Sequence, residues 1–320
     1  MNNKILIIDA MNTFIRNYVV NPSLDAHGAP IGGCKGFLMT LQKLTKQIKP
    51  DKIIVVWDGG GGSAKRRAIA KEYKEGRAPL KLNRAYSGMS SLEESQNRYD
   101  QMANTIEYLN QMPVIQLMIE DIEADDVIGY ITAQMKTLKD DIKIIVSMDK
   151  DFYQLCDDKT IIYRPVQDEY LNKNRILEQF KIHPNNFALA RAIDGDKSDN
   201  LEGVKGVGMK TIAKRMPFFA QEESITLDFL KKFLIKADDD IKLYKDILKE
   251  HKKVELNYKL MQLYAPSISI KSTQHIRSTI DNFKPTFNRT ETIKKMVVDG
   301  INDYNWDALF QKFRSLIAES

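Results

Sequence analysis

Short apolar runs followed by aspartate recur along the first half of this chain. The three runs and their aspartates are residues 5–8 with Asp9, residues 53–57 with Asp58, and residues 142–146 with Asp149. Residues 114–118 form a fourth run. Short β-branched runs separated by helical segments are typical of parallel strands in an α/β sheet. Because ligands bind beyond the carboxyl ends of such strands, the pattern predicts that the three aspartates converge on one cleft.

Helical periodicity fills the segments between these runs and dominates the second half of the chain. Apolar residues recur at helical spacing in residues 37–44 and 128–138. A C-terminal stripe predicts a helix packed into the core: Trp306, Leu309, Phe310, Phe313, Leu316 and Ile317. The composition shifts near Asn172, where we expect the sheet to end. The sequence therefore predicts an α/β part over residues 1–171 and a helical part over residues 172–320.

Residues 78–101 differ from both patterns. They are polar, they include Pro79, Gly88 and a Ser-rich turn, and they have little apolar periodicity. This composition predicts a mobile insertion in the α/β part.

The composition excludes several classes of protein. Of the 320 residues, 43% are hydrophobic and 28% are charged, as in ordinary globular proteins. The apolar runs are far too short to cross a bilayer or to form a signal-peptide core. Cys34 and Cys156 lie far apart and the four histidines are scattered, so no disulfide framework or zinc motif is expected. We therefore expect a cytoplasmic protein that does not bind membranes, or one in the host cytoplasm if a phage encodes it.

Basic residues gather in two segments. The formal net charge is +5, but residues 65–84 contain eight basic and two acidic residues. Within this stretch, Arg66 could bind phosphate and Tyr73 could stack on a base, although a solvated helix face would have the same composition. Residues 203–215 contain four basic residues and no acidic one. Both segments indicate a polyanionic partner.

The second basic segment is rich in glycines and lysines. The spacing from Gly203 to Lys210 is one residue too long for a phosphate-binding P-loop, and no strand precedes it. We instead expect a hairpin between two helices, in which Gly206 and Gly208 let the backbone approach a phosphate. Lys205 and Lys210 would add attraction that does not depend on base sequence. A plain glycine-rich connection with exposed lysines is the alternative.

Nine acidic residues stand in or near the predicted cleft. They are Asp9, Asp58, Glu123, Asp125, Asp126, Asp149, Asp151, Asp196 and Asp199. Crowded carboxylates repel one another unless cations neutralise them, and oxygen ligands without His or Cys suit Mg²⁺ or Mn²⁺. Two such ions roughly 4 Å apart would hold both sides of a phosphodiester. A solvated acidic surface would explain any single cluster, but less easily several clusters at the ends of apolar runs.

Together these segments resemble the structure-specific 5′-nucleases, which include the nuclease domain of bacterial DNA polymerase I and the phage 5′-exonucleases or flap endonucleases. The resemblance covers roughly residues 4–215. Its motifs, in chain order, are Ile-Ile-Asp9 with Arg16, Trp-Asp58, Tyr73-Lys74-Glu-Gly-Arg77, Glu123-Ala-Asp-Asp126, Ser147-Met-Asp-Lys-Asp151, Gly195-Asp-Lys-Ser-Asp-Asn200 and Gly203-Val-Lys-Gly-Val-Gly208. This chain departs from the family at Lys65, where the family usually has Phe, and by one additional residue between Asp58 and Lys74.

The resemblance implies a fold and a site. The fold would be the PIN-like 5′-nuclease fold, with a mostly parallel sheet flanked by helices. A helical arch near residues 65–105 would admit a 5′ single strand, and a helix–three-turn–helix element would cover residues 185–215. The helical second half would pack on the first as one catalytic unit.

Roles for individual residues follow from the same resemblance. Lys74 and Arg77 would meet the scissile phosphate, and Arg16 and Arg66 would contact other phosphates. Asp58, Glu123, Asp125, Asp126 and Asp149 would surround a first Mg²⁺, with Asp9 acting through water, and Asp151, Asp196 and Asp199 would surround a second. The hairpin around Gly206 would hold duplex DNA, in many members together with K⁺.

The implied function is a metal-dependent 5′-3′ exonuclease or flap endonuclease that acts in DNA replication. It would work as a monomer on 5′ flaps or 5′ ends of DNA, with RNA primers and replication proteins as further partners. A non-catalytic binder of branched DNA with the same fold is the main alternative. A phosphatase of the haloacid dehalogenase type is less well supported, because it needs a second aspartate where this chain has Met11.

Overall fold

A six-stranded sheet forms the centre of the molecule in the computed structural model, which describes residues 2–76, 82, 88–237 and 241–318. Its strand order is β3-β2-β1-β4-β5-β6, and β6 alone runs antiparallel to its neighbour. The strands are β1 (Lys4–Asp9), β2 (Lys52–Trp57), β3 (Ile115–Met118), β4 (Ile142–Val146), β5 (Thr160–Arg164) and β6 (Glu169–Leu171). The four strands predicted from the sequence are confirmed. Strands β5 and β6 were missed, because each contributes few consecutive apolar residues.

The strand order reverses between β1 and β4. Strands β2 and β3 extend the sheet on one side of this pair, and β5 and β6 extend it on the other. Such a reversal opens a crevice at the carboxyl ends of the two central strands. Asp9 ends β1, and Asp149 follows β4. The topology therefore brings two of the predicted site residues to the same crevice.

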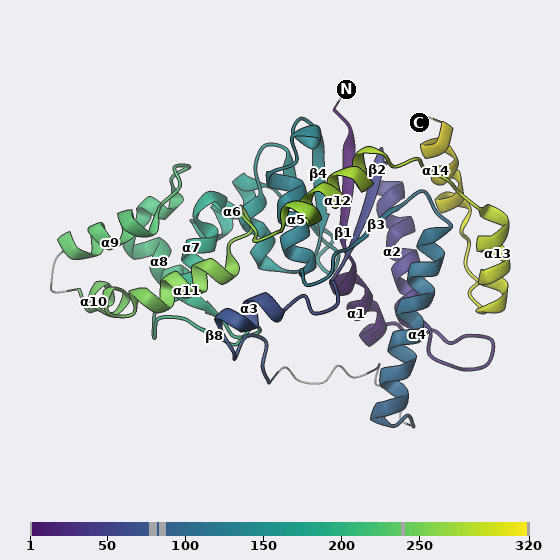
Figure 1. Cartoon of the computed structure of the whole chain (residues 1–320), viewed down its shortest axis with the longest axis horizontal. Coiled ribbons are helices and arrows are strands. Elements are labelled where there is room, and N and C mark those ends of the chain that lie inside the picture. The colour runs from purple at the N-terminus through teal and green to yellow at the C-terminus, as the bar shows by residue number, and fades with distance from the viewer. Residues whose placement is uncertain (1, 77–81, 83–87, 238–240, 319–320) are drawn as a thin grey trace.

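Helices cover both faces of the sheet (Figure 1). On one side lie α1 (Ala10–Val20), α2 (Gly32–Ile48), α4 (Ser91–Asn110), α13 (Arg289–Val298) and α14 (Asp307–Ala318). The core on the other side is formed with α5 (Ala124–Ala133), the 3-10 turn η2 (Lys150–Leu155), α6 (Lys173–Phe180), α7 (Pro184–Asp194), α8 (Met209–Arg215), α9 (Leu227–Lys236), α10 (Lys242–Lys249), α11 (His251–Met261) and α12 (Ile270–Asp281). Of these, α9 and α10 lie away from the sheet, beyond α8 and α11 (Figure 1). The remaining elements are α3 (Ala64–Ile69), the 3-10 turns η1 (Lys136–Leu138) and η3 (Pro217–Ala220), and the hairpin of β7 (Gly195–Asp196) and β8 (Leu201–Glu202).

Alternate residues of each central strand enter two different cores. In β1, Leu6 and Ile8 face the core shared with α2, α4 and α14, whereas Ile5 and Ile7 face the core shared with α5, α7 and α11. Side chains alternate between the two faces of a strand, so a parallel sheet covered on both faces reads as a continuous apolar run. This explains why the strand signal in the sequence was clear.

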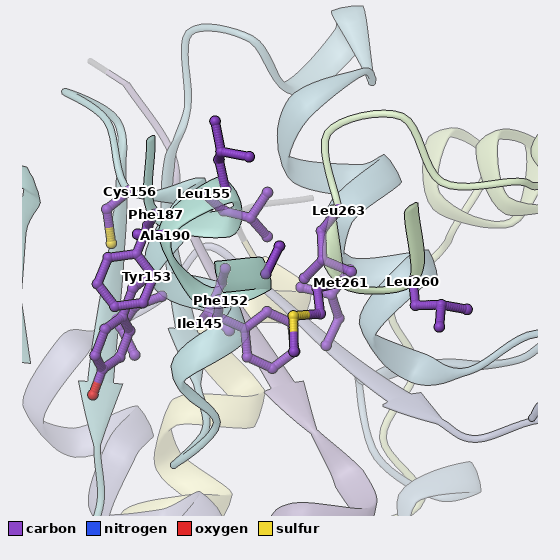
Figure 2. Packing of buried hydrophobic residues seen from close by; sticks show 14 of the residues in the cluster. Ile145, Phe152, Tyr153, Leu155, Cys156, Phe187, Ala190, Leu260, Met261 and Leu263 are labelled. Atoms are coloured by element: carbon purple, nitrogen blue, oxygen red, sulfur yellow. The ribbon is translucent and has the colours of Figure 1, made fainter. Parts of the chain in front are cut away.

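The helical second half shares both cores with the sheet. Figure 2 shows Phe152 and Tyr153 of η2 in one cluster with Phe187 of α7 and Met261 at the end of α11. The sheet ends at Leu171, and Asn172 caps α6 through a hydrogen bond from the backbone N–H of Arg175. The predicted composition boundary thus marks the end of the sheet, while the hydrophobic packing continues across it.

Helix α4 lies partly in the segment that the composition predicted as a mobile insertion and that the resemblance predicted as part of a helical arch, but its start was not predicted. It begins at Ser91, and Ser90 and Glu93 form a capping box that satisfies two backbone N–H groups. The Ser-x-x-Glu spacing was present in the sequence and would have predicted this helix start. Residues 77–81 and 83–87 of the predicted insertion lie outside the described residues.

Two predictions about sequence-wide features can be compared with the structure. Cys34 and Cys156 are both buried free thiols. Among the described helices, none combines the length and the apolarity needed to cross a bilayer.

The C-terminal stripe packs as predicted. Leu309, Phe310, Phe313 and Leu316 are buried against the sheet-facing helices, whereas Ile317 remains 37% exposed. Phe313→Ala should lower the free energy of unfolding by about 3–5 kcal/mol, because it leaves a cavity in this core. Ile317→Ala on the same helix should cost less than about 1 kcal/mol. Urea denaturation of both variants measures the difference, and equal small effects would show that α14 is not part of the core.

Candidate active site

A pocket of about 1100 Å³ opens at the carboxyl edge of the central strands. Five of the nine predicted acids line it: Asp9, Asp58, Glu123, Asp125 and Asp149. Lys74 and Ser198 contribute from the basic segment and from the loop between β7 and β8, and helix α4 forms the opposite wall. The predicted convergence of the three strand-end aspartates is therefore confirmed.

Hydrogen bonds connect the ends of β1 and β4 at the floor of the pocket. Asp9 accepts hydrogen bonds from the Asn12 backbone N–H at 3.1 Å and from the Ser147 hydroxyl at 2.9 Å. The Asn12 side chain accepts from the backbone N–H of Met148 at 3.1 Å. Both carboxylate oxygens of Asp9 are thus engaged by the protein, which fixes their orientation.

Asp58 connects the end of β2 to the start of α5. Its Oδ1 accepts a hydrogen bond from the Ala124 backbone N–H at 2.8 Å, and a carboxylate is favourable at a helix N-terminus. The next residue, Gly59, lies so close to the chain after β3 that a Cβ would be 1.7 Å from the carbonyl oxygen of Ile119. A glycine is required there, because any side chain would push Asp58 away from α5.

Arg66 lies among the acids rather than on a surface that DNA could reach. It is 7% exposed, and its guanidinium donates to Glu123, to Asp125 at 3.0 Å and to Asp126 at 3.0 Å. Its Nε also donates to the carbonyl oxygen of Leu260 at 3.1 Å. The guanidinium is enclosed by these protein groups, and its predicted phosphate contact stays a prediction.

Tyr73 is also placed differently from the prediction. It is 2% exposed, and its hydroxyl lies 3.1 Å from a carboxylate oxygen of Glu123, to which it donates. A base cannot stack on a ring that is packed into the core, so the predicted stacking role is wrong for this arrangement. The sequence showed an aromatic residue among basic ones, but it could not show which way the ring would point.

Lys74 enters the pocket next to Tyr73. Its Nζ donates to Glu123 at 2.7 Å, and its backbone N–H donates to the carbonyl oxygen of Asp199 at 2.9 Å. Asn200 adds a hydrogen bond to the carbonyl oxygen of Glu72 at 2.9 Å. These contacts connect the basic segment to the loop between β7 and β8. Arg77, its predicted companion, lies outside the described residues.

Arg191 of α7 is a site residue that the sequence analysis missed. Its guanidinium donates to Asp151 at 3.1 Å through Nε and to Asp196 through Nη2, and its side chain is 12% exposed. It joins the turn after β4 to the β7–β8 hairpin. A signal was present, because Arg191 is the one charged residue in the apolar stretch 187–193, and a lone arginine on an apolar helix face needs a partner.

Burial and neighbouring charges shift the pKa values of several acids in the pocket. Burial raises the pKa of Asp9 to about 7, with Asp58 adding to the rise. Burial and the neighbouring Asp149 also raise the pKa of Asp151, and Arg191 does not cancel the effect. Glu123 is the opposite case: burial would raise its pKa, but Arg66 and Lys74 outweigh burial and lower it to about 2. The acids without enough positive charge nearby therefore retain protons near neutral pH.

The acids differ in how many of their oxygens the protein already uses. Glu123 accepts from four donors and Asp196 accepts on both oxygens, from Arg191 and from Ser198. Asp58, Asp125 and Asp149 each use only Oδ1 in hydrogen bonds with described residues. In the described part of the chain, no three acids stand together as a complete metal site. Among the predicted acids that line the pocket, Asp58, Asp125 and Asp149 are those with a carboxylate oxygen that no described residue uses.

The predicted glycine hairpin follows α7 and the β7–β8 pair. Val204 and Val207 are buried and anchor it, whereas Lys205, Gly206 and Lys210 are exposed. Gly206 has a φ of +78°, which favours glycine, and Gly208 is the residue before the first turn of α8. The predicted contact of this hairpin with DNA stays a prediction.

Arg16 lies outside the carboxylate pocket. It lines a smaller cavity of about 100 Å³ with Lys43 and Tyr163, and Asn12 borders both cavities. Partial burial lowers the pKa of Arg16. Its predicted phosphate contact stays a prediction.

Solved structures with the same overall fold include the flap endonuclease of bacteriophage T5. The form crystallised with DNA and metal ions has a TM-score of 0.65 and 19% sequence identity, and the match covers 99% of this chain and 100% of that one. A form of the T5 protein crystallised with metal ions has a TM-score of 0.64 and 18% identity over 98% of both chains. These likenesses confirm the predicted fold of a mostly parallel sheet flanked by helices.

Sequence relatives identify the family. The model of the 5′-3′ exonuclease N-terminal resolvase-like domain matches residues 4–181. A 5′-3′ exonuclease of Aquifex aeolicus is 29% identical over 266 residues, which cover 81% of this chain and 81% of that protein. DNA polymerase I of Caldicellulosiruptor bescii is 31% identical over 238 residues, which cover 71% of this chain and 26% of the polymerase. With a family model that spans more than half of its residues, the chain belongs to the 5′-3′ exonuclease family, nucleases that hydrolyse phosphodiester bonds.

Proposed function

We propose that this protein is a Mg²⁺-dependent 5′-nuclease that cuts DNA at 5′ ends and 5′ flaps during replication. The observation that carries the proposal is the convergence of Asp58, Asp125 and Asp149 on one pocket, each with one carboxylate oxygen not used by a described residue. Oxygen donors without His or Cys suit Mg²⁺, and Mn²⁺ would substitute for it. A non-catalytic DNA binder would have no need for this crowding of acids beside phosphate.

The metal would supply charge that the protein lacks. Two divalent ions held by the pocket acids would activate a water molecule and stabilise the leaving oxygen of the cut bond. The protein's own part is orientation: Asp9, Glu123 and Asp196 are held by hydrogen bonds on both oxygens and act as fixed neighbours of the ligands. This refines the sequence prediction, in which all nine acids surrounded the metals, with only Asp9 acting through water.

Lys74 and Arg77 would complete the reaction centre. Lys74 lines the pocket and contacts Glu123, so its ammonium group lies beside the predicted metal ligands, where it would bind a non-bridging phosphate oxygen. Arg77, three residues further along the chain, would bind the same phosphate. Arg66 would act indirectly, by neutralising Glu123, Asp125 and Asp126.

The duplex part of the substrate would lie on the hairpin between α7 and α8. Exposed Lys205 and Lys210 attract the phosphate backbone, and the exposed backbone at Gly206 allows close approach. The hairpin around Gly206 would also hold K⁺, whose positive charge would favour a bound phosphate. The proposal has four further parts. We propose that the protein also acts on RNA primers and contacts replication proteins, and that it is a monomer located in the cytoplasm.

Replacing one pocket ligand tests the catalytic assignment. Asp149→Asn keeps the acceptor for the Asp151 backbone N–H but removes a charge that faces the pocket. Cleavage of a 5′-labelled flap in Mg²⁺ should fall by about 10³-fold or more, while binding of the same DNA in EDTA changes little.

Asp228→Asn on the exposed surface of α9 is the matched control and should cleave normally. Nicked and blunt duplexes measured in parallel report substrate preference. Wild-type-level cleavage by Asp149→Asn, in protein free of the wild-type enzyme, would contradict the metal assignment.

Arg191 generates a prediction about stability. Arg191→Met leaves Asp151 and Asp196 close together without their shared cation, and should lower the free energy of unfolding in EDTA by about 3 kcal/mol. Adding Asp151→Asn to this variant should restore part of the loss, because it removes one uncompensated charge. The exposed Arg175→Met serves as control and should cost less than about 1 kcal/mol. Equal losses for the two arginines, measured by urea denaturation, would refute this role.

The raised carboxylate pKa values predict how pH changes the stabilisation by Mg²⁺. In the folded protein the pKa of Asp9 is about 7 and that of Asp151 is also raised, so between about pH 4 and these values the folded state binds more protons than the unfolded chain. Stability of the metal-free protein therefore falls as pH rises through this window. Mg²⁺ should raise the melting temperature more at pH 8 than at pH 5.5. NaCl at the same ionic strength is the control, and an equal Mg²⁺ effect at both pH values would contradict the prediction.

A further inference from the structure

A buried glutamine, Gln154, connects the turn that carries Asp151 to the chain at the end of α11. Gln154 belongs to η2 and is 1% exposed. Its Nε2 donates to the carbonyl oxygen of Asp151 at 2.7 Å and to that of Met261 at 2.9 Å. Its Oε1 accepts from the backbone N–H of Leu263 at 2.7 Å. The side-chain amide is therefore fully used, and it fixes η2 to residues 261–263.

The backbone of Asp151 is held on both sides. Its carbonyl oxygen accepts from Gln154, and its N–H donates to Oδ1 of Asp149 at 2.8 Å. Asp149 lines the carboxylate pocket and has a second oxygen that no described residue uses. The direction of that oxygen depends on the position of the Asp151 backbone, and this position depends on Gln154.

The segment that holds Gln154 also holds the other group of acids. The carbonyl oxygen of Leu260 accepts from Nε of Arg66 at 3.1 Å. The guanidinium of Arg66 in turn pairs with Glu123, Asp125 and Asp126. Residues 260–263 therefore support both groups of acids, one through Arg66 and the other through Gln154.

Close packing fixes this segment in the core. Leu260, Met261 and Leu263 are at most 3% exposed, and Figure 2 shows them in one cluster with Phe152 of η2. Helix α5 lies directly against the segment, because a Cβ on Gly129 would be 2.5 Å from the carbonyl oxygen of Leu263. Closely packed interiors transmit small displacements, so a fixed segment here holds the neighbouring turn in place.

We propose that Gln154 is a positioning residue for the metal site of this nuclease. Because Gln154 is buried, it acts through the Asp151 backbone and gives Asp149 and Asp151 the direction that a divalent cation requires. Groups that orient metal ligands from outside the ligand shell commonly determine metal affinity. The inference rests on the proposed function. It assigns to residues 260–263, which lie beyond the part of the chain that the family model matches, a role in assembling the site.

Gln154→Met tests this role, because methionine has a similar length but no amide to donate to the two carbonyl oxygens. Electron paramagnetic resonance measures Mn²⁺ binding without DNA, and flap cleavage is followed against Mg²⁺ concentration. The dissociation constant for Mn²⁺ and the Mg²⁺ concentration for half-maximal cleavage should both rise by about 10-fold. At saturating Mg²⁺ the cleavage rate should recover most of the wild-type value, because Gln154 acts on the ligands and not on the reacting atoms.

Gln42→Met is the matched control. Gln42 of α2 is 8% exposed and also binds the backbone through both ends of its amide. It donates to the carbonyl oxygen of Asn305 at 2.9 Å and accepts from the N–H of Leu309 at 3.2 Å, in the core on the opposite face of the sheet. Both substitutions should lower the melting temperature, because each leaves buried backbone groups without a partner. Only Gln154→Met should weaken Mn²⁺ binding by the folded protein.

Tyr264→Phe is a second, milder variant. The Tyr264 hydroxyl donates to the backbone carbonyl oxygen of Gln154, so its removal loosens the same turn while the ring remains. Mn²⁺ binding should weaken in the same direction as in Gln154→Met, but less. This variant decides the question if Gln154→Met does not fold.

The outcomes separate this proposal from the proposed function. If the wild-type protein cuts no flap in Mg²⁺, the proposed function fails, and the Mn²⁺ measurements still decide the role of Gln154. If flaps are cut but the Gln154 and Tyr264 variants bind Mn²⁺ as the wild type does, only the positioning role is refuted. An equal loss of Mn²⁺ binding in Gln42→Met would also refute it. Weaker binding confined to Gln154→Met and Tyr264→Phe establishes the role.

Discussion

Repulsion among closely packed carboxylates is the constraint around which this site is built. The crevice between β1 and β4 gathers acids from four separate parts of the chain, and each additional charge makes ionisation of its neighbours less favourable. Two arginines reduce this repulsion. Arg66 pairs with Glu123, Asp125 and Asp126, and Arg191 pairs with Asp151 and Asp196. Both are largely enclosed, so the surrounding packing holds them in position.

The two arginines also connect parts of the fold that are distant in sequence. Arg66 brings α3 to the start of α5, and Arg191 brings α7 to the turn after β4. A third connection comes from the backbone N–H of Lys74, which donates to the carbonyl oxygen of Asp199, and from the side-chain amide of Asn200, which donates to the carbonyl oxygen of Glu72. The loop between β7 and β8, which precedes the hairpin around Gly206 in the chain, is thereby joined to the segment that carries Lys74. The same contacts therefore hold both the acids of the pocket and the segments proposed to bind the substrate.

The acids of the site differ in their capacity to bind a cation. Those with both oxygens engaged are oriented but have little capacity for a cation, whereas Asp58, Asp125 and Asp149 keep an oxygen toward the pocket. Burial raises the pKa of Asp9, and the nearby charges of Asp58 and Asp149 add to the rise. A site that remains short of positive charge is suited to binding cations, at some cost in stability without them.

Local patterns in the sequence were sufficient to predict the central strands and the crevice at their ends. Runs such as residues 53–57 indicated strands, and the acids after them indicated the crevice, because a strand buried on both faces is apolar throughout and ends abruptly. The start of helix α4 was not predicted although Ser90 and Glu93 mark it, since the exposed residues of this helix obscure the apolar period. The family resemblance supplied the arch, the hairpin and the residue roles, and the relatives confirmed the family itself.

Side-chain direction and pairing could be learned only from the folded chain. The sequence showed Arg66 and Tyr73 as members of a basic segment, but packing turned both inward onto Glu123. Likewise, nothing in the order of residues paired Arg191 with Asp151, 40 positions away. Periodicity is local, because it follows from the repeat of the backbone, and it can therefore be recognised in a single segment. Charge compensation depends on distance in space, which exists only once the segments have packed together.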